Sequence, residues 1–171
     1  MNPTNDPAII RPRLADGVYI SRHALVTGDV EIGRDSSIWH MTVIRGDRAL
    51  IALGARTNIQ DGSILHADPD APLTIGDDVS VGHAAIIHGC TIESNVLVGM
   101  GAVILNHAVI GSGSLVAARA LVTEGMIVPP NPLVVGIPAR IKPLDPRHAE
   151  RIMRTAQNYV NLKNEYLAGL R

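Results

Sequence analysis

The sequence predicts an all-β protein, a parallel β-helix of six-residue repeats followed by one C-terminal α-helix. An aliphatic residue returns about every six residues through most of the chain, and a small or β-branched residue follows most of these four positions later. Hydrophobic residues make up 46% of the sequence, yet it has no Phe, one Trp and three Tyr. A narrow, repetitive interior filled by aliphatic side chains explains that composition, because bulky rings would not fit it.

Each repeat is expected to form a short strand and a corner. The aliphatic side chain points inward, the small residue lets the chain turn, three repeats close a triangular coil, and coils stack at about 4.8 Å. The aliphatic positions are Ile20, Val26, Ile32, Ile38, Ile44, Leu53, Ile59, Leu65, Ile75, Val81, Ile87, Ile92, Val98, Ile104, Ile110, Val116 and Val122. The small positions are Ala24, Val30, Ser36, Thr42, Thr57, Ser63, Val79, Ala85, Thr91, Val96, Ala102, Ala108, Ser114 and Ala120.

Three irregularities interrupt the repeat. The interval from 44 to 53 has three extra residues, the interval from 65 to 75 has four, and the interval from 87 to 92 lacks one. Loops that leave a regular scaffold often carry its function. The second and third irregularities flank the histidines described below, so they mark the region of interest.

The C-terminal segment predicts one helix over about 146–168. Asp145 is expected as its N-cap and Pro146 as its first helical residue. Residues at near-helical spacing follow: Ile152, Ala156, Tyr159, Lys163, Tyr166 and Leu170. We therefore divide the chain into a β-helix domain, 1–144, with hexads from about 20 to 127, and a C-terminal helix, 145–171, that packs on it.

Two of the seven histidines occupy equivalent positions in the repeat. His66 and His88 are each the second residue of a hexad, on the same face and one full coil apart. Their backbones should lie about one strand spacing apart, which lets two imidazoles bind one ion at about 2.0–2.1 Å. Arg45 stands one coil below them in the same column.

His83 falls on the neighbouring face, where its ring cannot easily reach the other two histidines of its own chain. If three identical chains pack side by side, one chain's His66 and His88 can meet its neighbour's His83. That arrangement gives three nitrogen ligands and an open position, as in catalytic zinc sites, and implies a cyclic homotrimer. Asp61 lies one coil below His83, so we expect it near the same seam, facing the neighbouring chain's Arg45.

The same residues leave two other interpretations open. They could line a trimer interface that holds no metal, or one histidine could act as general base in an acyltransferase. The other four histidines are interpreted as structural: His23, His40, His107 and His148.

Charge and cysteine content indicate a cytoplasmic protein. Fifteen Lys and Arg balance 16 Asp and Glu, so nothing favours nucleic acid or an anionic membrane as a partner. The single cysteine, Cys90, cannot form an internal disulfide, which suits a reducing compartment. We find no basic-then-apolar leader and no apolar run near the roughly 18 residues of a membrane helix.

Several motifs resemble the γ-class carbonic anhydrase family. They are Ile-Arg-Gly-Asp at 44–47, Asn-Ile-Gln-Asp-Gly-Ser-Ile-Leu-His at 58–66, Val-Gly-His-Ala-Ala-Ile-Ile-His-Gly-Cys at 81–90 and Val-Gly-Ile-Pro-Ala-Arg at 135–140. The last motif is less specific, because hexapeptide acyltransferases share it. The resemblance covers the chain from about residue 10 to the final helix.

The resemblance implies a left-handed β-helix homotrimer with a shared metal site. Zinc, or iron or cobalt, would be held by His66 and His88 of one subunit and His83 of the next. A metal-bound hydroxide would hydrate CO2 reversibly to bicarbonate, with no nucleic acid or membrane partner. The catalytic residues implied are Gln60, Asn58, Tyr159 and Asn161, and the interface network is Arg45, Asp47 and Asp61.

The chain also departs from the family's pattern. Arg48 follows the Arg-Gly-Asp element where the archetype has an acidic residue. The acidic loop used for proton shuttling is reduced to residues 67–72, where Asp68 or Asp70 would have to serve. The alternatives are a metal-dependent thioester-type hydrolase, a CoA-dependent hexapeptide acyltransferase and a non-catalytic scaffold.

Overall fold

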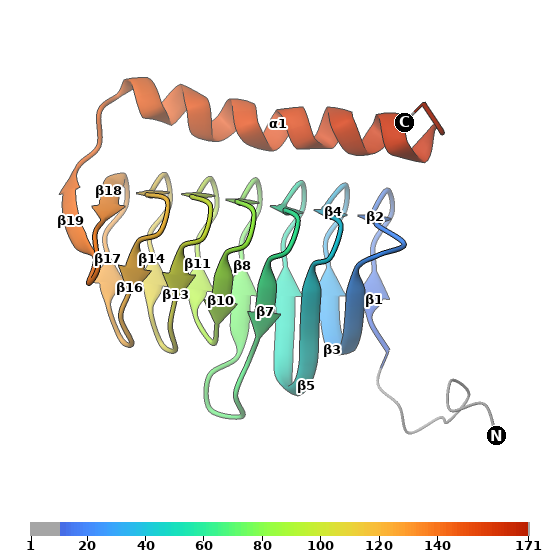
Figure 1. Cartoon of the computed structure of the whole chain (residues 1–171), viewed down its shortest axis with the longest axis horizontal. Coiled ribbons are helices and arrows are strands. Elements are labelled where there is room, and N and C mark those ends of the chain that lie inside the picture. Colours follow the sequence, from blue (N-terminus) through green and yellow to red (C-terminus); the bar gives the residue numbers. More distant parts are fainter. Residues whose placement is uncertain (1–10, 171) are drawn as a thin grey trace.

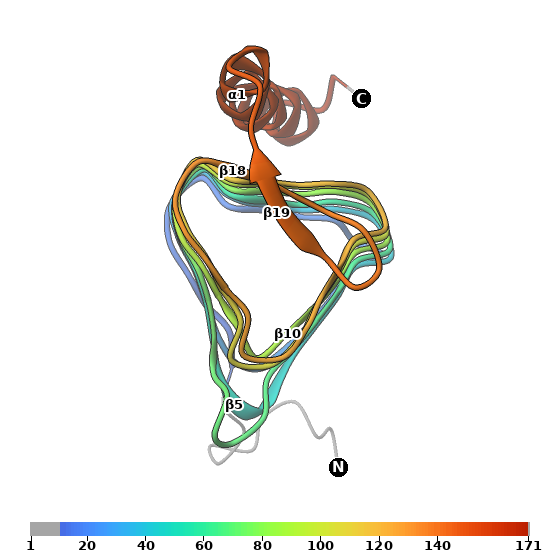
Figure 2. The same ribbon diagram turned by 90° about the vertical axis from the view of Figure 1, so that its left-hand side faces the viewer.

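The computed structural model describes residues 11–170 and confirms the parallel β-helix. The coils stack along one axis and form a triangle in cross-section (Figures 1 and 2). Parallel pairing joins strands of successive coils, as between β7 (Ile64–His66) and β10 (Ile86–His88). An antiparallel pair, β18 (Pro132–Val135) and β19 (Arg140–Pro143), follows the last parallel coils. Helix α1 (Arg147–Leu167) then runs back along the stack (Figure 1).

Two hydrogen-bonded sheets cover the sides of the triangle. The 11-stranded sheet contains β1 (Arg13–Leu14), β3 (Leu25–Ile32), β5 (Val43–Leu53), β7, β8 (Leu73–Ile75), β10, β11 (Thr91–Ile92), β13 (Val103–Ile104), β14 (Val109–Ile110), β16 (Leu121–Val122) and β17 (Ile127–Val128). The eight-stranded sheet contains β2 (Tyr19–Ile20), β4 (Ser37–Ile38), β6 (Asn58–Ile59), β9 (Ser80–Val81), β12 (Leu97–Val98), β15 (Leu115–Val116), β18 and β19. Helix α1 lies over the eight-stranded sheet (Figure 2).

The core is the column of aliphatic side chains inside the triangle. The aliphatic residues expected to point inward are all buried from Ile32 to Val122. The side chains of Ile44, Leu65 and Ile87 are fully inaccessible to solvent. Burial of each such side chain stabilises the fold by about 1.5–3 kcal/mol before conformational entropy is counted. The repeat therefore predicts the core, because the inward direction recurs with the six-residue period.

The three irregularities have different structural consequences. The extra residues before position 53 make β5 a long strand that pairs with β3 on both sides of the corner. On its other edge β5 pairs with β7 before the corner and with β8 after it. The four extra residues before position 75 lie within the loop 67–72, which projects between β7 and β8 (Figure 1). Mutual backbone hydrogen bonds between Asp68 and Ala71, of 3.2 and 2.9 Å, close this loop.

The missing residue corrects one sequence assignment. Thr91 was expected at a small inward position, but it is exposed. Cys90 fills that position instead and is 1% exposed. Because this hexad is one residue short, the inward corner comes three residues after Ile87 instead of four.

Helix α1 agrees closely with its expected range. It begins at Arg147 with Pro146 at the N-cap, so the assignment of Asp145 as N-cap and Pro146 as first helical residue was wrong by one position. The Asp145 carboxylate accepts a hydrogen bond from the Arg147 backbone N–H at 3.0 Å. Ile152 and Ala156 are buried on its inner face. Leu170, expected on that face, is 73% exposed because it lies beyond the last helical residue.

Within residues 11–170, no helix combines the length and apolarity required to cross a bilayer. The cytoplasmic location stays a prediction.

Candidate metal centre

The structure places His66 and His88 side by side at the ends of β7 and β10. The strand register pairs His66 with His88 on one side and with Arg45 on the other, as the repeat predicts. His66 Nδ1 and His88 Nε2 are 2.9 Å apart, and the ring centroids are 4.9 Å apart. The two imidazoles are partly buried and face each other across the coil spacing.

The outer nitrogen of each ring meets a hydrogen-bond acceptor. His66 Nε2 lies 3.1 Å from Asp47 Oδ1, and His88 Nδ1 hydrogen-bonds the side-chain oxygen of Asn106. These oxygens can only accept, so the outer nitrogen of each ring is the donor in its contact. The two inner nitrogens lie at hydrogen-bond distance from each other, and a cation between them would be bound by the lone pair of each.

A metal ion fits between these nitrogens with little adjustment. Tetrahedral bonds of 2.0–2.1 Å hold two ligand nitrogens about 3.3 Å apart, so the pair would open by only a few tenths of an ångström. A carboxylate oxygen of Asp68 lies within 4.8 Å of both imidazoles. Among the described residues, this His66, Asp68 and His88 cluster is suited to hold a metal ion.

Arg45 and Asp47 form an ion pair beside the two histidines. Arg45 Nη1 lies 2.5 Å from Asp47 Oδ2, while the other carboxylate oxygen accepts the hydrogen bond from His66 Nε2. Desolvation acts to raise the pKa of Asp47, but the hydrogen bonds from Arg45 and His66 outweigh it and lower the pKa below its ordinary value. Asp47 thus stays an ionised acceptor for the His66 ring.

His83 occupies a different corner of the coil, as expected. Backbone hydrogen bonds stack His40, Asp61 and His83 in one column. His83 Nδ1 lies 3.0 Å from Asp61 Oδ2, and both side chains are more than two-fifths exposed. Ala84, the next residue, has a φ of 56°, a left-handed conformation that glycines adopt at the same corner of adjacent coils. Within the described residues of one chain, His83 does not join the His66 and His88 cluster.

Asn58 lies on β6, and Gln60 follows the end of that strand, directly before Asp61. Gln60 Nε2 donates to Asn58 Oδ1 at 3.0 Å, and Asn58 Nδ2 donates to Ser80 Oγ at 2.8 Å. Both amides are buried, with exposures of 5% and 1%. Their orientations are therefore fixed by one another and by β9.

Tyr159 reaches this region from helix α1, whereas Asn161 points elsewhere. The Tyr159 ring packs edge-on against Trp39 with centroids 5.4 Å apart. Burial and the nearby Asp61 carboxylate raise the pKa of Tyr159 above its ordinary value. Asn161 is exposed and accepts a hydrogen bond from Gln157. Two positions apart on a helix correspond to about 200° of rotation, so a joint role for Tyr159 and Asn161 stays a prediction.

Asn106 was not identified from the sequence, although the repeat contains a signal for it. Ile104 pairs with Ile87, so Asn106 stands one coil from Gly89, beside His88. Its side chain contacts both His88 and Asp68. Asn106 could have been predicted as a polar residue on the coil next to a predicted ligand.

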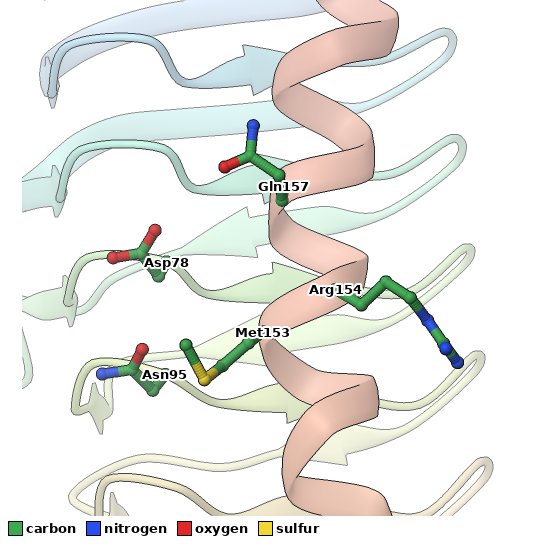
Figure 3. Close-up of a pocket in the computed structure, with 5 residues that line it drawn as sticks. All are labelled: Asp78, Asn95, Met153, Arg154 and Gln157. Atoms are coloured by element: carbon green, nitrogen blue, oxygen red, sulfur yellow. The ribbon is translucent and has the colours of Figure 1, made fainter.

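A cavity of about 390 Å³ lies under helix α1, and no histidine is among the residues that line it (Figure 3). Met153 of α1 points toward Asn95 of a coil corner, and Asp78, Arg154 and Gln157 complete the lining (Figure 3). None of these five is a predicted site residue. The cavity is the gap between the helix and the coil corners, and the histidines lie instead on the outer surface of the coils.

Comparison with known proteins identifies relatives along nearly the whole chain. The family described as bacterial transferase hexapeptide (six repeats) matches residues 89–124. A carbonic anhydrase of Geobacillus kaustophilus is 49% identical over 163 residues, 93% of this chain and 87% of that protein. The mitochondrial gamma carbonic anhydrase 2 of Arabidopsis thaliana is 40% identical over 88% of this chain, which spans 57% of the plant protein.

A solved structure shows the same architecture. The hexapeptide transferase family protein of Anaplasma phagocytophilum superposes with a TM-score of 0.87 at 37% identity, covering 91% of this chain and 92% of that one.

Proposed function

The chain belongs to the γ-class carbonic anhydrase family of left-handed β-helix proteins, and we propose that it catalyses metal-dependent, reversible hydration of CO2 to bicarbonate. The observation that carries the proposal is the His66 and His88 pair, whose inner nitrogens lie 2.9 Å apart while their outer nitrogens contact Asp47 and Asn106. Such a pair is built to bind a cation. Three neutral imidazoles suit zinc, iron and cobalt alike.

The third ligand in this proposal is His83 of a neighbouring subunit. Within one chain His83 stands at another corner beside Asp61, and both side chains are exposed. Side-by-side packing of three chains would bring that corner against the His66 and His88 face of the next chain. The result is a homotrimer with three shared sites.

The residues around the site have distinct roles in this proposal. A metal ion held by the three histidines would supply the nucleophile, because coordination lowers the pKa of water to about 7. Gln60, held by Asn58, orients the reactants by hydrogen bonding and adds no charge that would weaken the metal's Lewis acidity. Tyr159 closes the helix side of the pocket, and Arg45 with Asp61 joins the two subunits.

The decisive experiment measures CO2 hydration by stopped flow. The protein is reconstituted anaerobically with zinc and, separately, with iron, and His83→Ala serves as the blank. We expect rates well above the blank, together with loss of metal but retention of the fold in His83→Ala. A full metal complement in that variant would exclude the shared site, and no rate with either metal at full occupancy would exclude CO2 hydration.

A second candidate function is CoA-dependent acyl transfer, favoured by the likeness to the Anaplasma hexapeptide transferase family protein. It differs from the first in not needing the metal. Acyl transfer that survives chelator treatment and the His83→Ala substitution would favour this candidate.

A further inference from the structure

We propose that Asn106 is a positioning residue that holds His88 in the tautomer required for metal binding and joins it to the loop 67–72 through Asp68. The inference rests on the metal site of the proposed function and adds to it a residue on the next coil. It follows from hydrogen-bond chemistry at three side chains.

The orientation of the Asn106 amide is fixed by its two partners. Its Nδ2 donates to Asp68 Oδ2 at 3.0 Å, and a carboxylate can only accept. The amide oxygen must then face His88, where it hydrogen-bonds Nδ1. An amide oxygen has no proton to give, so the proton lies on His88 Nδ1. His88 Nε2 is left with its lone pair directed at the partner nitrogen of His66, 2.9 Å away.

The backbone around the site leaves room for this contact. Gly89 follows His88, and a Cβ at this position would lie 2.5 Å from Asn106 Oδ1 and 2.8 Å from the Ala71 Cβ. Its φ of 50° also lies in the left-handed region. A side chain at 89 would push both Asn106 and the loop away from His88. The short hexad, which places Gly89 here, thus has a specific consequence for the ligand.

The loop adds the third part of the arrangement. Asp68 is anchored by its backbone hydrogen bonds to Ala71, and its carboxylate lies within 4.8 Å of the ligand atoms of His66 and His88. One amide therefore connects two neighbouring coils and an inserted loop. Outer partners of this kind hold a histidine ring in place and contribute about 10–100-fold to metal affinity or activity.

The test compares Asn106→Ala with Asn106→Asp in the full-length protein. Zinc and cobalt affinities are measured by competition with a chromogenic chelator, and the His88 tautomer by 15N NMR of histidine-labelled, metal-free protein. For Asn106→Ala we expect affinity to fall about 10–100-fold and the His88 signals to change from the Nδ1–H form to a mixture. Asn106→Asp keeps an acceptor facing His88, so it should retain the Nδ1–H form even though its charge repels Asp68.

Two control variants separate positioning from general damage. Asp68→Asn keeps an oxygen that can accept from Asn106, so the His88 tautomer should not change. Asp70→Ala alters the same loop at a side chain that is 84% exposed and should leave affinity and tautomer as in the wild type. Unaltered oligomeric state and circular dichroism in each variant exclude misfolding as the cause.

The outcomes also distinguish this inference from the proposed function. Wild-type affinity and an unchanged tautomer in Asn106→Ala would overturn the inference even if CO2 hydration is found. An Nε2–H tautomer in the metal-free wild type would do the same. The expected NMR and affinity changes would support it even if the enzyme does not hydrate CO2, because neither readout depends on turnover.

Discussion

At the residue scale, the chemistry of the site depends on which atoms can donate a proton. Asp47 and Asn106 each offer an oxygen to the outer nitrogen of a histidine, and this leaves the two inner nitrogens as the atoms that would bind a metal ion. If the outer nitrogens of these two imidazoles faced hydrogen-bond donors instead, the inner nitrogens would carry the protons and would repel a cation. Metal binding is thus determined as much by the outer partners as by the histidines.

Gln60 should affect catalysis without affecting metal content. It is 5% exposed and hydrogen-bonded to Asn58, on the other side of the proposed seam from His66 and His88. We expect Gln60→Ala to lower the rate of CO2 hydration roughly 10–100-fold, with metal content by atomic absorption unchanged. Loss of the metal in this variant would show that Gln60 supports the ligands instead.

Cys90 should be chemically inert in the folded protein. Burial raises the pKa of its thiol from 9.0 to about 12. Because the folded pKa is the higher one, the stability gained by keeping the thiol protonated is complete below pH 9 and is lost as the pH rises toward 12. We expect no reaction with a thiol reagent at pH 8 until denaturant is added, followed by one equivalent. Fast labelling of native protein would contradict this placement.

At the scale of elements, the ion pair between Lys163 and Asp35 attaches helix α1 to the coils. Lys163 Nζ donates to Asp35 Oδ1 at 2.7 Å and to the Gly17 carbonyl at 2.8 Å, and its side chain is 2% exposed. Asp35 occupies a coil corner with a φ of 59°. The helix is therefore fixed at a point that the repeat provides on the N-terminal coils, close to the C-terminal end of α1.

Replacing Lys163 should weaken the protein in a pH-dependent way. The hydrogen bond from Lys163 lowers the pKa of Asp35 below 3.8, so its contribution is present above about pH 4 and is lost as pH falls through the folded-state pKa. We expect Lys163→Met to lower the free energy of unfolding by about 1.5–3 kcal/mol at pH 7, and by less at pH 3. Denaturant unfolding at both values measures this.

Lys142→Met is the matched control, because Lys142 is exposed on β19. This substitution should change the free energy of unfolding little at either pH. An equal loss for Lys163→Met at pH 7 and pH 3 would show that packing of the side chain matters more than its charge.

At the scale of the whole molecule, the proposed homotrimer with shared sites predicts that two inactive variants can restore each other's metal sites. His83→Ala chains keep His66 and His88, and His88→Ala chains keep His83. Homotrimers of either variant lack every site, but co-expressed chains combine at random, and about a quarter of the seams then join one intact half to the other. We expect metal content and activity to return to about a quarter of wild type.

Purified single variants mixed without subunit exchange provide the control and should stay inactive. Failure of the co-expressed variants to recover metal, in trimers shown by mass spectrometry to contain both chains, would exclude a site shared between subunits.

The sequence by itself determined the coils, their register and the columns of side chains. A six-residue period repeats the inward direction, so Ile44, Leu65 and Ile87 could be assigned to the core and His66 to the same column as His88. These are local properties of the repeat. The helix range could be predicted for the same reason, because the spacing of its buried residues is encoded within one segment.

The tertiary structure alone decided which polar atoms meet. Lys163 and Asp35 are 128 residues apart, and Asn106 and Asp68 are 38 apart, on elements that the repeat places independently. Cys90 took the inward position expected for Thr91 because a shortened hexad has two ways to close its corner. Such choices depend on distances and hydrogen-bond directions between neighbouring coils, loop and helix, which a one-dimensional period does not contain.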